Sequence, residues 1–188
     1  MLFRSVLRTD GTSRWETSAE ESNRAVFECC ERLSIVPANV GAWLYCDGPG
    51  SILGIRTVAM ALRTWQVLHP RPIHGYCSLA VVAHAGGNRD VSVVADARRE
   101  TWHCYQRGLG LRRVAAGELA PPLVTPEHFR HWSPLPGGTT IAPYSLADLL
   151  PRVWDEELLL PSDHPDAFLH EEPSYVTWTP SIHRAPLR

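Results

Sequence analysis

The chain has 188 residues, of which 44% are hydrophobic, so it is large enough for one domain or two small lobes around a buried core. Its formal net charge is −2, which argues against a strong electrostatic hold on nucleic acid. No apolar run is long enough to span a membrane, no signal peptide is evident, and the five cysteines have no regular spacing. We therefore expect a cytoplasmic protein that keeps its thiols reduced.

The first predicted elements are a hairpin and a helix. Residues 3–7 and 13–16 are expected to be strands, because Asp10-Gly11 between them is a strong hairpin signal. Ser18 and Glu21 fit a capping box that opens a helix over residues 18–33.

A glycine turn follows a short buried strand predicted over residues 42–45. Gly48-Pro49-Gly50-Ser51 leads into an apolar helix over residues 52–68. The glycines allow a tight turn, and Ser51 is a good N-cap. A strand, a glycine turn and a helix N-terminus in this order form a potential anion site.

Three interpretations of this turn compete. A phosphate-binding P-loop requires a Lys after its second Gly, and the chain contains no Lys. A dinucleotide fingerprint requires the spacing G-x-G-x-x-G and an acidic residue about twenty positions later. Here Gly48, Gly50 and Gly54 have a wider spacing, and no Asp or Glu lies between Asp47 and Asp90. The third interpretation is a strand-to-helix turn that binds no ligand.

The helix over residues 52–68 is apolar around most of its circumference, which indicates burial on more than one side. One face can pack on a sheet, and the other requires another subunit or the chain's own second lobe. Arg56 lies one turn into this helix, where a buried charge is costly unless it is paired. It either binds a carboxylate or phosphate at a subunit interface or bonds within its own chain.

The chain as a whole is expected to divide into two lobes. The first lobe covers residues 1–88 and carries the glycine turn, and the smaller second lobe with the C-terminal tail covers residues 89–188. Residues 108–122 are expected to form a loop, and Thr125-Pro126 is expected to start a short helix. Further predicted elements are strands over 72–76, 91–95, 100–106 and 141–144 and helices from 78 to 84 and from Ser145. Asp96-Ala97-Arg98 is expected to be a structural turn between two of these strands.

No residue set predicts catalysis or metal binding. His128 and His131 are the only close His pair that could share a helix face, and a zinc site needs further ligands. Ser51 lacks the elbow sequence of a nucleophilic Ser.

The chain resembles the TsaB (YeaZ) family of bacterial tRNA-modification proteins. The resemblance rests on Gly48-Pro49-Gly50-Ser51 with Gly54 and Arg56, the apolar helix that follows, and the run from Pro72 to Leu79. It extends over residues 2–106 and implies an α/β, actin-like ATPase (ribonuclease-H-like) fold with a small, irregular second lobe. The family's first strand has no counterpart here, so the resemblance implies a truncated first lobe whose sheet is one strand short.

The resemblance also implies a function. Members of the family carry an M22 glycoprotease-like name, which implies no protease activity. This chain is therefore expected to be non-catalytic. It would bind the catalytic threonylcarbamoyl transferase subunit in tRNA threonylcarbamoyladenosine modification, and would form a homodimer when alone. The contact surface would be the helices over 18–33 and 51–68, with the residues Ala25, Cys29, Ile52, Ile55, Ala59 and Arg63 exposed for it.

No cofactor, strong nucleic-acid contact or membrane contact is expected, and the sequence does not support a nucleotide at the subunit interface. Two alternatives stay open. One is a nucleotide-binding enzyme of the same fold. The other is a divergent structural paralogue that dimerises without serving tRNA modification.

Overall fold

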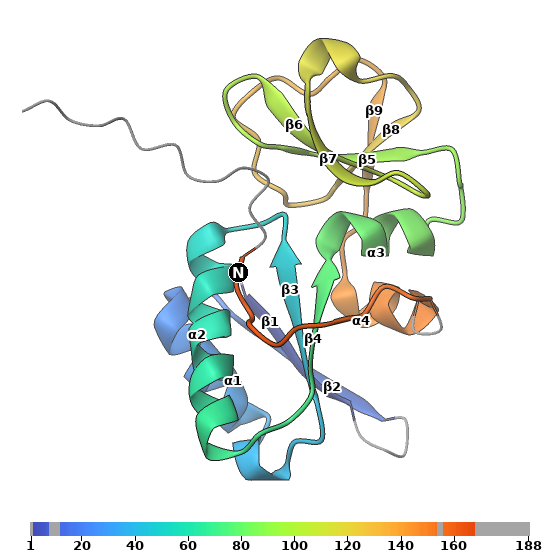
Figure 1. Ribbon diagram of the computed structural model, residues 1–188. Helices are drawn as coiled ribbons and strands as arrows, with labels where there is room; N and C mark the ends of the chain where they lie inside the picture. The colour runs from blue at the N-terminus through green and yellow to red at the C-terminus, as the bar shows by residue number, and fades with distance from the viewer. Residues whose placement is uncertain (1, 8–11, 154–155, 168–188) are drawn as a thin grey trace, which may run out of the picture.

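The computed structural model describes residues 2–7, 12–153 and 156–167, which form two lobes with a helix between them (Figure 1). The elements of the first lobe are β1 (Leu2–Leu7), β2 (Ser13–Ser18), α1 (Ser22–Arg32), η1 (Pro37–Asn39), β3 (Trp43–Gly48), α2 (Ile52–Leu68), β4 (Ile73–Cys77) and α3 (Ser78–Ala85). The second lobe contains β5 (Ser92–Asp96), β6 (Thr101–Gln106), β7 (Gly110–Ala115), η2 (Ala116–Glu118), β8 (Leu123–Pro126) and β9 (Thr139–Ala142).

The hairpin of β1 and β2 is confirmed, with an antiparallel register from Leu2 opposite Ser18 to Leu7 opposite Ser13. The predicted turn residues 10 and 11 lie outside the described residues. The predicted start of α1 is wrong, because Ser18 ends β2 and its hydroxyl donates to the Glu28 carboxylate at 2.7 Å. The helix begins four residues later at Ser22, and Glu21 makes no side-chain capping bond.

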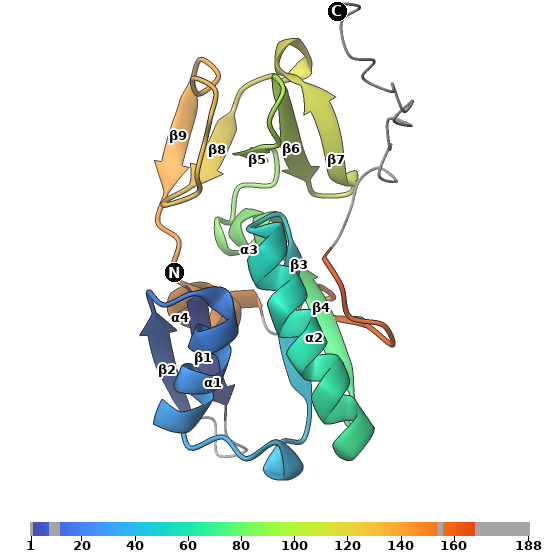
Figure 2. The ribbon, with the colours of Figure 1, turned by 90° about the vertical axis from the view of Figure 1, so that its left-hand side faces the viewer.

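The sheet of the first lobe is in two parts. β3 pairs in parallel with β4, whose other edge pairs with β10 (Leu160–Pro161). Among the described residues, β1 pairs with β2 alone, so β1 and β3 both have an edge without a strand partner. α1 and α2 lie side by side over one face of these strands (Figure 2).

The second lobe is a five-stranded sheet in the order β7-β6-β5-β8-β9. Two predictions are therefore wrong. The expected loop over 108–122 contains β7, whose backbone completes an antiparallel ladder with β6. The expected helix at Thr125 is strand β8, which pairs in parallel with both β5 and β9. Pairing on both edges buries Leu123 and Thr125, and this tertiary burial overrides the local Thr-Pro capping signal.

Helix α3 lies between the lobes and is the centre of the main core. Every residue of α3 except His84 is buried. Leu79 and Val81 pack with Val93 and Ala95 of the second lobe. Two elements that follow the second-lobe sheet, α4 (Leu146–Leu149) and η3 (Leu150–Val153), also join this core, and β10 pairs with β4 of the first lobe. No helix in the described part of the chain is long and apolar enough to cross a membrane.

Leu79→Ala tests the role of α3. Leu79 has no exposed surface, so its truncation leaves a cavity between the lobes, and we expect the free energy of unfolding to fall by about 2 to 5 kcal/mol. Urea unfolding followed by tryptophan fluorescence measures this change. The control is Leu109→Ala in the exposed β6–β7 turn, expected within about 0.5 kcal/mol of the unaltered protein. Equal losses from both variants would contradict the placement of α3.

Candidate functional site

The glycine turn is a structural joint between β3, α2 and α3. Gly48 has φ +141°, a conformation that L side chains rarely adopt. The Ser51 hydroxyl accepts the backbone N–H of Gly54 at 3.3 Å, which confirms Ser51 as the N-cap. The buried Ser78 hydroxyl donates to the Pro49 carbonyl at 2.8 Å. These contacts fix the conformation of the turn, and the Ser51 oxygen serves as the helix cap. Both observations agree with the interpretation of the turn as a strand-to-helix connection that binds no ligand.

Arg56 bonds within its own chain. Its Nε lies 3.5 Å from Asp166 Oδ1, and Arg63 Nη2 lies 3.6 Å from Asp166 Oδ2. All three side chains are about half exposed, so each pair contributes at most about 1 kcal/mol. Asp166 belongs to a C-terminal segment that also contacts β3, since its backbone N–H donates to the Tyr45 hydroxyl at 3.3 Å. The two arginines therefore tie this segment to α2.

The residues predicted to form a partner surface fall into two groups. Ile52 and Arg63 are exposed, and Ile55 is half-buried. The expected exposure of Ala25, Cys29 and Ala59 is wrong, because all three are buried. They lie on the inner faces of α1 and α2, which pack onto the strands. The structure therefore leaves only part of the predicted set accessible to a partner.

An apolar stripe on α2 was missed at the level of sequence. Leu53, Met60 and Val67 are 74%, 57% and 84% exposed. They are spaced by seven residues, so they follow one line along the helix. The exposure of all three residues places the line on the solvent-exposed side of α2. We call these three residues the α2 stripe. The seven-residue spacing was the available signal, but an apolar helix surface gave no indication of which face the strands would cover.

Phe27 is a separate exposed apolar residue on α1. Its ring meets Trp65 of α2 edge-on, with 6.4 Å between ring centroids. Trp65 in turn stacks on Trp43 of β3 at 4.8 Å. This contact lies on another side of α2 than the α2 stripe, because Trp65 is more than a quarter turn of the helix away from that line.

A group of partly buried titratable residues lies near the end of β3. Burial, with a smaller contribution from the nearby Asp47 charge, raises the pKa of Cys46 to about 12 and that of Cys77 to about 11. Burial also raises the pKa values of Asp47 and Tyr144. Thiols with such pKa values stay protonated at neutral pH, and only the thiolate is a good nucleophile.

The predicted turn at Asp96 is confirmed as a structural feature. One carboxylate oxygen accepts the Arg98 backbone N–H at 2.6 Å, and the other accepts those of Trp132 and Ser133 at 2.7 and 2.8 Å. Burial alone would raise the pKa of Asp96, but the N–H groups of Ser133, Arg98 and Trp132 outweigh it, and the pKa is lowered. The Arg98 guanidinium lies 4.3 Å from the centroid of the Trp132 ring.

The two candidate metal ligands do not share a helix face. His128 follows strand β8 and has φ +65°, so no helix carries it toward His131. His128 Nε2 lies 3.8 Å from Glu127 Oε1 on the surface. Within the described ranges, no group of three or more His, Cys, Asp or Glu side chains is placed to hold a metal ion.

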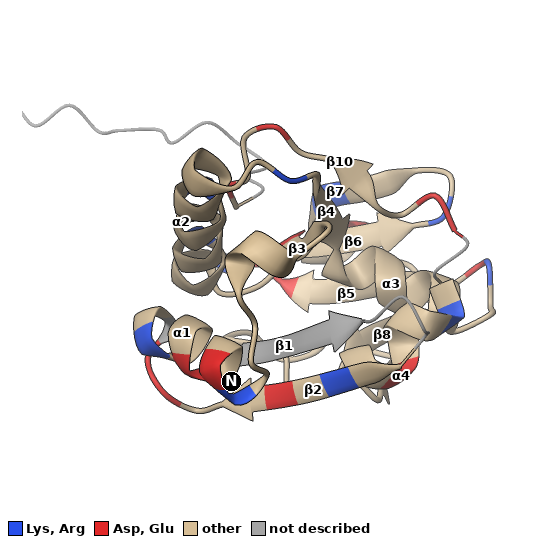
Figure 3. Ribbon diagram, turned by 90° about the horizontal axis from the view of Figure 1, so that it is seen from below, with Lys and Arg blue, Asp and Glu red and all other residues tan. Residues whose placement is uncertain are grey.

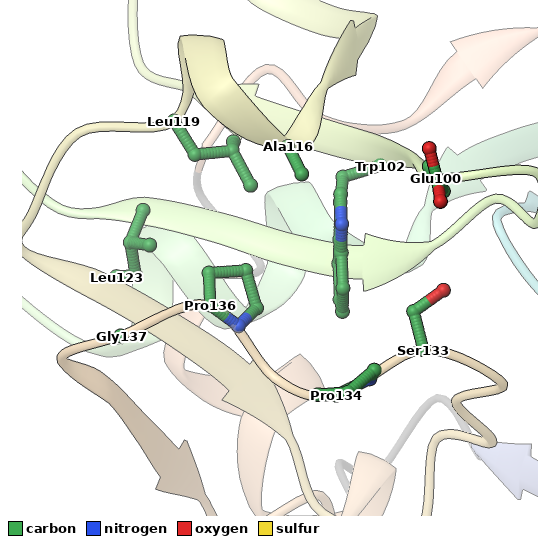
Figure 4. Close-up of a pocket in the computed structure, with 9 residues that line it drawn as sticks. All are labelled: Glu100, Trp102, Ala116, Leu119, Leu123, Ser133, Pro134, Pro136 and Gly137. Carbon is green, nitrogen blue, oxygen red and sulfur yellow. The ribbon is translucent and has the colours of Figure 1, made fainter.

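The second lobe has a pocket of about 390 Å³ on the face of its sheet that is turned away from α3. Trp102, Leu119, Leu123 and two prolines form its apolar walls, and Glu100 and Ser133 lie at one end (Figure 4). The pocket offers apolar surface to a ligand or side chain.

Comparison with known proteins finds no matching protein-family model and no matching curated sequence. Two solved structures are similar to most of the chain. YeaZ from Pseudomonas aeruginosa is 17% identical with a TM-score of 0.56, over 89% of this chain and 93% of that one. An uncharacterized protein with similarity to peptidase YeaZ from Pseudomonas aeruginosa is 16% identical with a TM-score of 0.52, over 85% and 89%.

At such low identity the similarity shows the fold. The resemblance to YeaZ is confirmed at that level, and so is the actin-like, ribonuclease-H-like fold predicted from the glycine turn and its neighbours.

Asp96→Asn tests the carboxylate at the β5–β6 turn. The amide replaces one acceptor oxygen by an NH2 group, and we expect a loss of about 2 kcal/mol in the free energy of unfolding at pH 7. Because the folded pKa is lowered, the carboxylate stabilises the fold above its ordinary pKa of about 3.9, and the effect disappears as pH falls through the folded value. Urea unfolding of both proteins from pH 7 to pH 2 should show the difference shrinking below about pH 4. The exposed Asp90→Asn is the control, and an equal loss from it would contradict this role.

Alkylation tests the buried thiols. At pH 8 less than about one in a thousand Cys46 and Cys77 side chains should be thiolate, against about one in ten for an ordinary thiol of the unfolded chain. Iodoacetamide labelling, followed by mass spectrometry, should therefore be at least about 100-fold slower for these residues in the folded protein than in urea. Similar rates in both conditions would contradict the burial of this group.

Proposed function

We propose that this protein is a non-catalytic partner protein that docks through α1 and α2. It forms a homodimer when alone and binds the catalytic threonylcarbamoyl transferase subunit during threonylcarbamoyladenosine modification of tRNA. The observation that carries the proposal is the α2 stripe, an uncovered apolar line on a helix of a YeaZ-like fold. The tRNA-modification role rests on the resemblance of the glycine turn and its helix to the TsaB family.

The surroundings of the α2 stripe favour protein binding. Three large apolar side chains in one line can be buried together by a second helix, and burying each one contributes about 1.5 to 3 kcal/mol. Leu68, the neighbour of Val67 in the sequence, adds exposed apolar surface at the end of the line. Arg56 and Arg63 lie along one side of it, and Asp166 partly neutralises them. Two copies of α2 can then approach across a two-fold axis with less repulsion between like charges.

The groups that would suggest catalysis have structural roles. The Ser51 hydroxyl caps α2, and the Cys46 and Cys77 thiols stay protonated. The glycine turn is held by Ser78. These features favour a scaffold over an enzyme, and the proposal includes no cofactor.

Leu53→Glu is the variant that tests the surface. It replaces the first residue of the α2 stripe by a carboxylate, and we expect the dissociation constant of the homodimer to rise at least about 30-fold, since burying this charge costs about 2 kcal/mol or more. Leu109→Glu, a similarly exposed site in the second lobe, should leave it unchanged. Light scattering after size exclusion measures the mass of each protein alone and mixed with the catalytic subunit of the same organism.

Each outcome separates the alternatives. A homodimer that converts to a one-to-one heterodimer, and that Leu53→Glu weakens in both forms, agrees with the proposal. A homodimer that ignores the catalytic subunit contradicts the tRNA-modification role and favours a structural paralogue. A monomer under all conditions contradicts the proposed surface, and measurable ATP affinity of that monomer favours a nucleotide-binding enzyme.

A further inference from the structure

The pocket of the second lobe has a polar end that the proposed function does not use. Its volume of about 390 Å³ lies in the range of about 300 to 1,000 Å³ that is typical of small-molecule sites. The buried residues Trp102 and Leu123 form part of its walls, and Glu100 and Ser133 lie at one end (Figure 4). A ligand with an apolar body and one polar head group therefore fits this pocket.

The Glu100 and Ser133 side chains offer acceptors to that head group. The Glu100 backbone carbonyl accepts the Ala116 N–H at 3.2 Å, and no described residue bonds the Glu100 carboxylate. The Ser133 side chain hydrogen-bonds the Asp96 carboxylate. An ionised carboxylate only accepts, so the Ser133 hydroxyl donates its proton there and keeps its lone pairs for a ligand. A carboxylate beside such an oxygen attracts an ammonium group, which carries three N–H donors.

Positive charge lies beside the same end of the pocket. Arg98 precedes Glu100 by two residues in the β5–β6 turn, and its guanidinium lies 4.3 Å from the ring centroid of Trp132, the neighbour of Ser133. Arg130 lies 5.2 Å from the same centroid. A guanidinium has five N–H donors in its plane, so one that lies over a ring still directs donors to its surroundings. The polar end therefore has charges of both signs.

One carboxylate fixes the two segments that carry these groups. Asp96 accepts the Arg98 N–H from the turn, and from the segment after β8 it accepts the N–H groups of Trp132 and Ser133. Residues 98–100 have φ values of +66°, +52° and +59°, which residues with side chains rarely adopt. Such a backbone persists where surrounding contacts hold it, and it is frequent at ligand sites. The polar end of the pocket is therefore preorganised.

We propose that the second-lobe pocket binds an α-amino acid with a large apolar side chain. The apolar side chain enters the pocket, the ammonium group binds the Glu100 carboxylate and the Ser133 oxygen, and the ligand's carboxylate pairs with Arg98. A head group of one sign would be repelled by Glu100 or by Arg98, whereas a zwitterion is complementary to both. This site is separate from the α2 stripe and does not depend on the proposed function.

The probe for this site is L-phenylalanine, added to the ¹⁵N-labelled full chain and followed by NMR chemical-shift titration. We expect a dissociation constant of about 1 mM or lower, with the largest shifts at residues 98–102 and 132–137. Two analogues each lack one charge: N-acetyl-L-phenylalanine has no ammonium group, and L-phenylalaninol has no carboxylate. Each should bind at least about tenfold more weakly, because each leaves one charged group of the site without its partner.

Charge variants of the protein complete this comparison. Glu100→Gln should weaken L-phenylalanine binding at least about tenfold, to the level of N-acetyl-L-phenylalanine, and Arg98→Gln should weaken it to the level of L-phenylalaninol. Glu127→Gln removes an exposed carboxylate of the same lobe that does not line the pocket, and it should leave the affinity unchanged. If Arg98→Gln does not fold, L-phenylalaninol decides the carboxylate contact.

Ala116→Leu tests the apolar part of the site. Ala116 lines the pocket and is exposed, so a larger side chain there takes up pocket volume without crowding the core. Binding should weaken at least about tenfold while the urea midpoint stays unchanged. Undiminished binding by Ala116→Leu, equal affinities of Glu100→Gln and Glu127→Gln, shifts confined to α2, or no shifts with about 10 mM L-phenylalanine would each overturn the proposal.

Discussion

The burial of α3 is the constraint on which the two lobes depend. Its circumference is apolar, so it needs neighbours on all sides, and it finds them in the second-lobe sheet and in η3. Both ends of α3 bond to other segments of the chain. The Ser78 hydroxyl fixes the glycine turn at one end, and the Arg107 guanidinium donates to the Ala83 and His84 carbonyls at the other, at 3.1 and 2.7 Å. A cation at a helix C-terminus is also favoured by the helix dipole.

The split sheet and the exposed α2 stripe have a common origin. The first lobe has one layer of helices over its strands, and this layer bridges two strand pairs that do not bond to each other. α1 and α2 bury Ala25, Cys29 and Ala59 against each other and the strands. Leu53, Met60 and Val67 of α2 stay exposed. In soluble proteins, large exposed apolar patches mark sites of interaction with other molecules.

Charges in this chain serve mainly to hold segments in place. Asp96 gathers three backbone N–H groups and so fixes the chain at Trp132 and Ser133 against the β5–β6 turn. Arg56 and Arg63 hold the segment at Asp166 beside α2. On α1 and β2, charges from the two elements lie close together (Figure 3), and Arg32 there bonds both Glu28 and the Thr17 carbonyl. The Cys46 and Cys77 thiols beside the glycine turn stay protonated at neutral pH, which suits a structural joint more than a reactive centre.

The type of fold was predicted from the resemblance of the sequence to the TsaB family. The sequence by itself also determined the glycine turn, the bounds of α2, the Ser51 cap, and the hairpin of β1 and β2. These features depend on local signals: apolar periodicity, a capping hydroxyl and Asp-Gly. Tertiary structure alone decided that Thr125-Pro126 is a strand, that the chain after Ala142 returns to the first lobe, and that Leu53, Met60 and Val67 stay exposed. An apolar helix face reads the same in sequence whether a strand, a second lobe or nothing covers it, because burial is a property of neighbours that lie far along the chain.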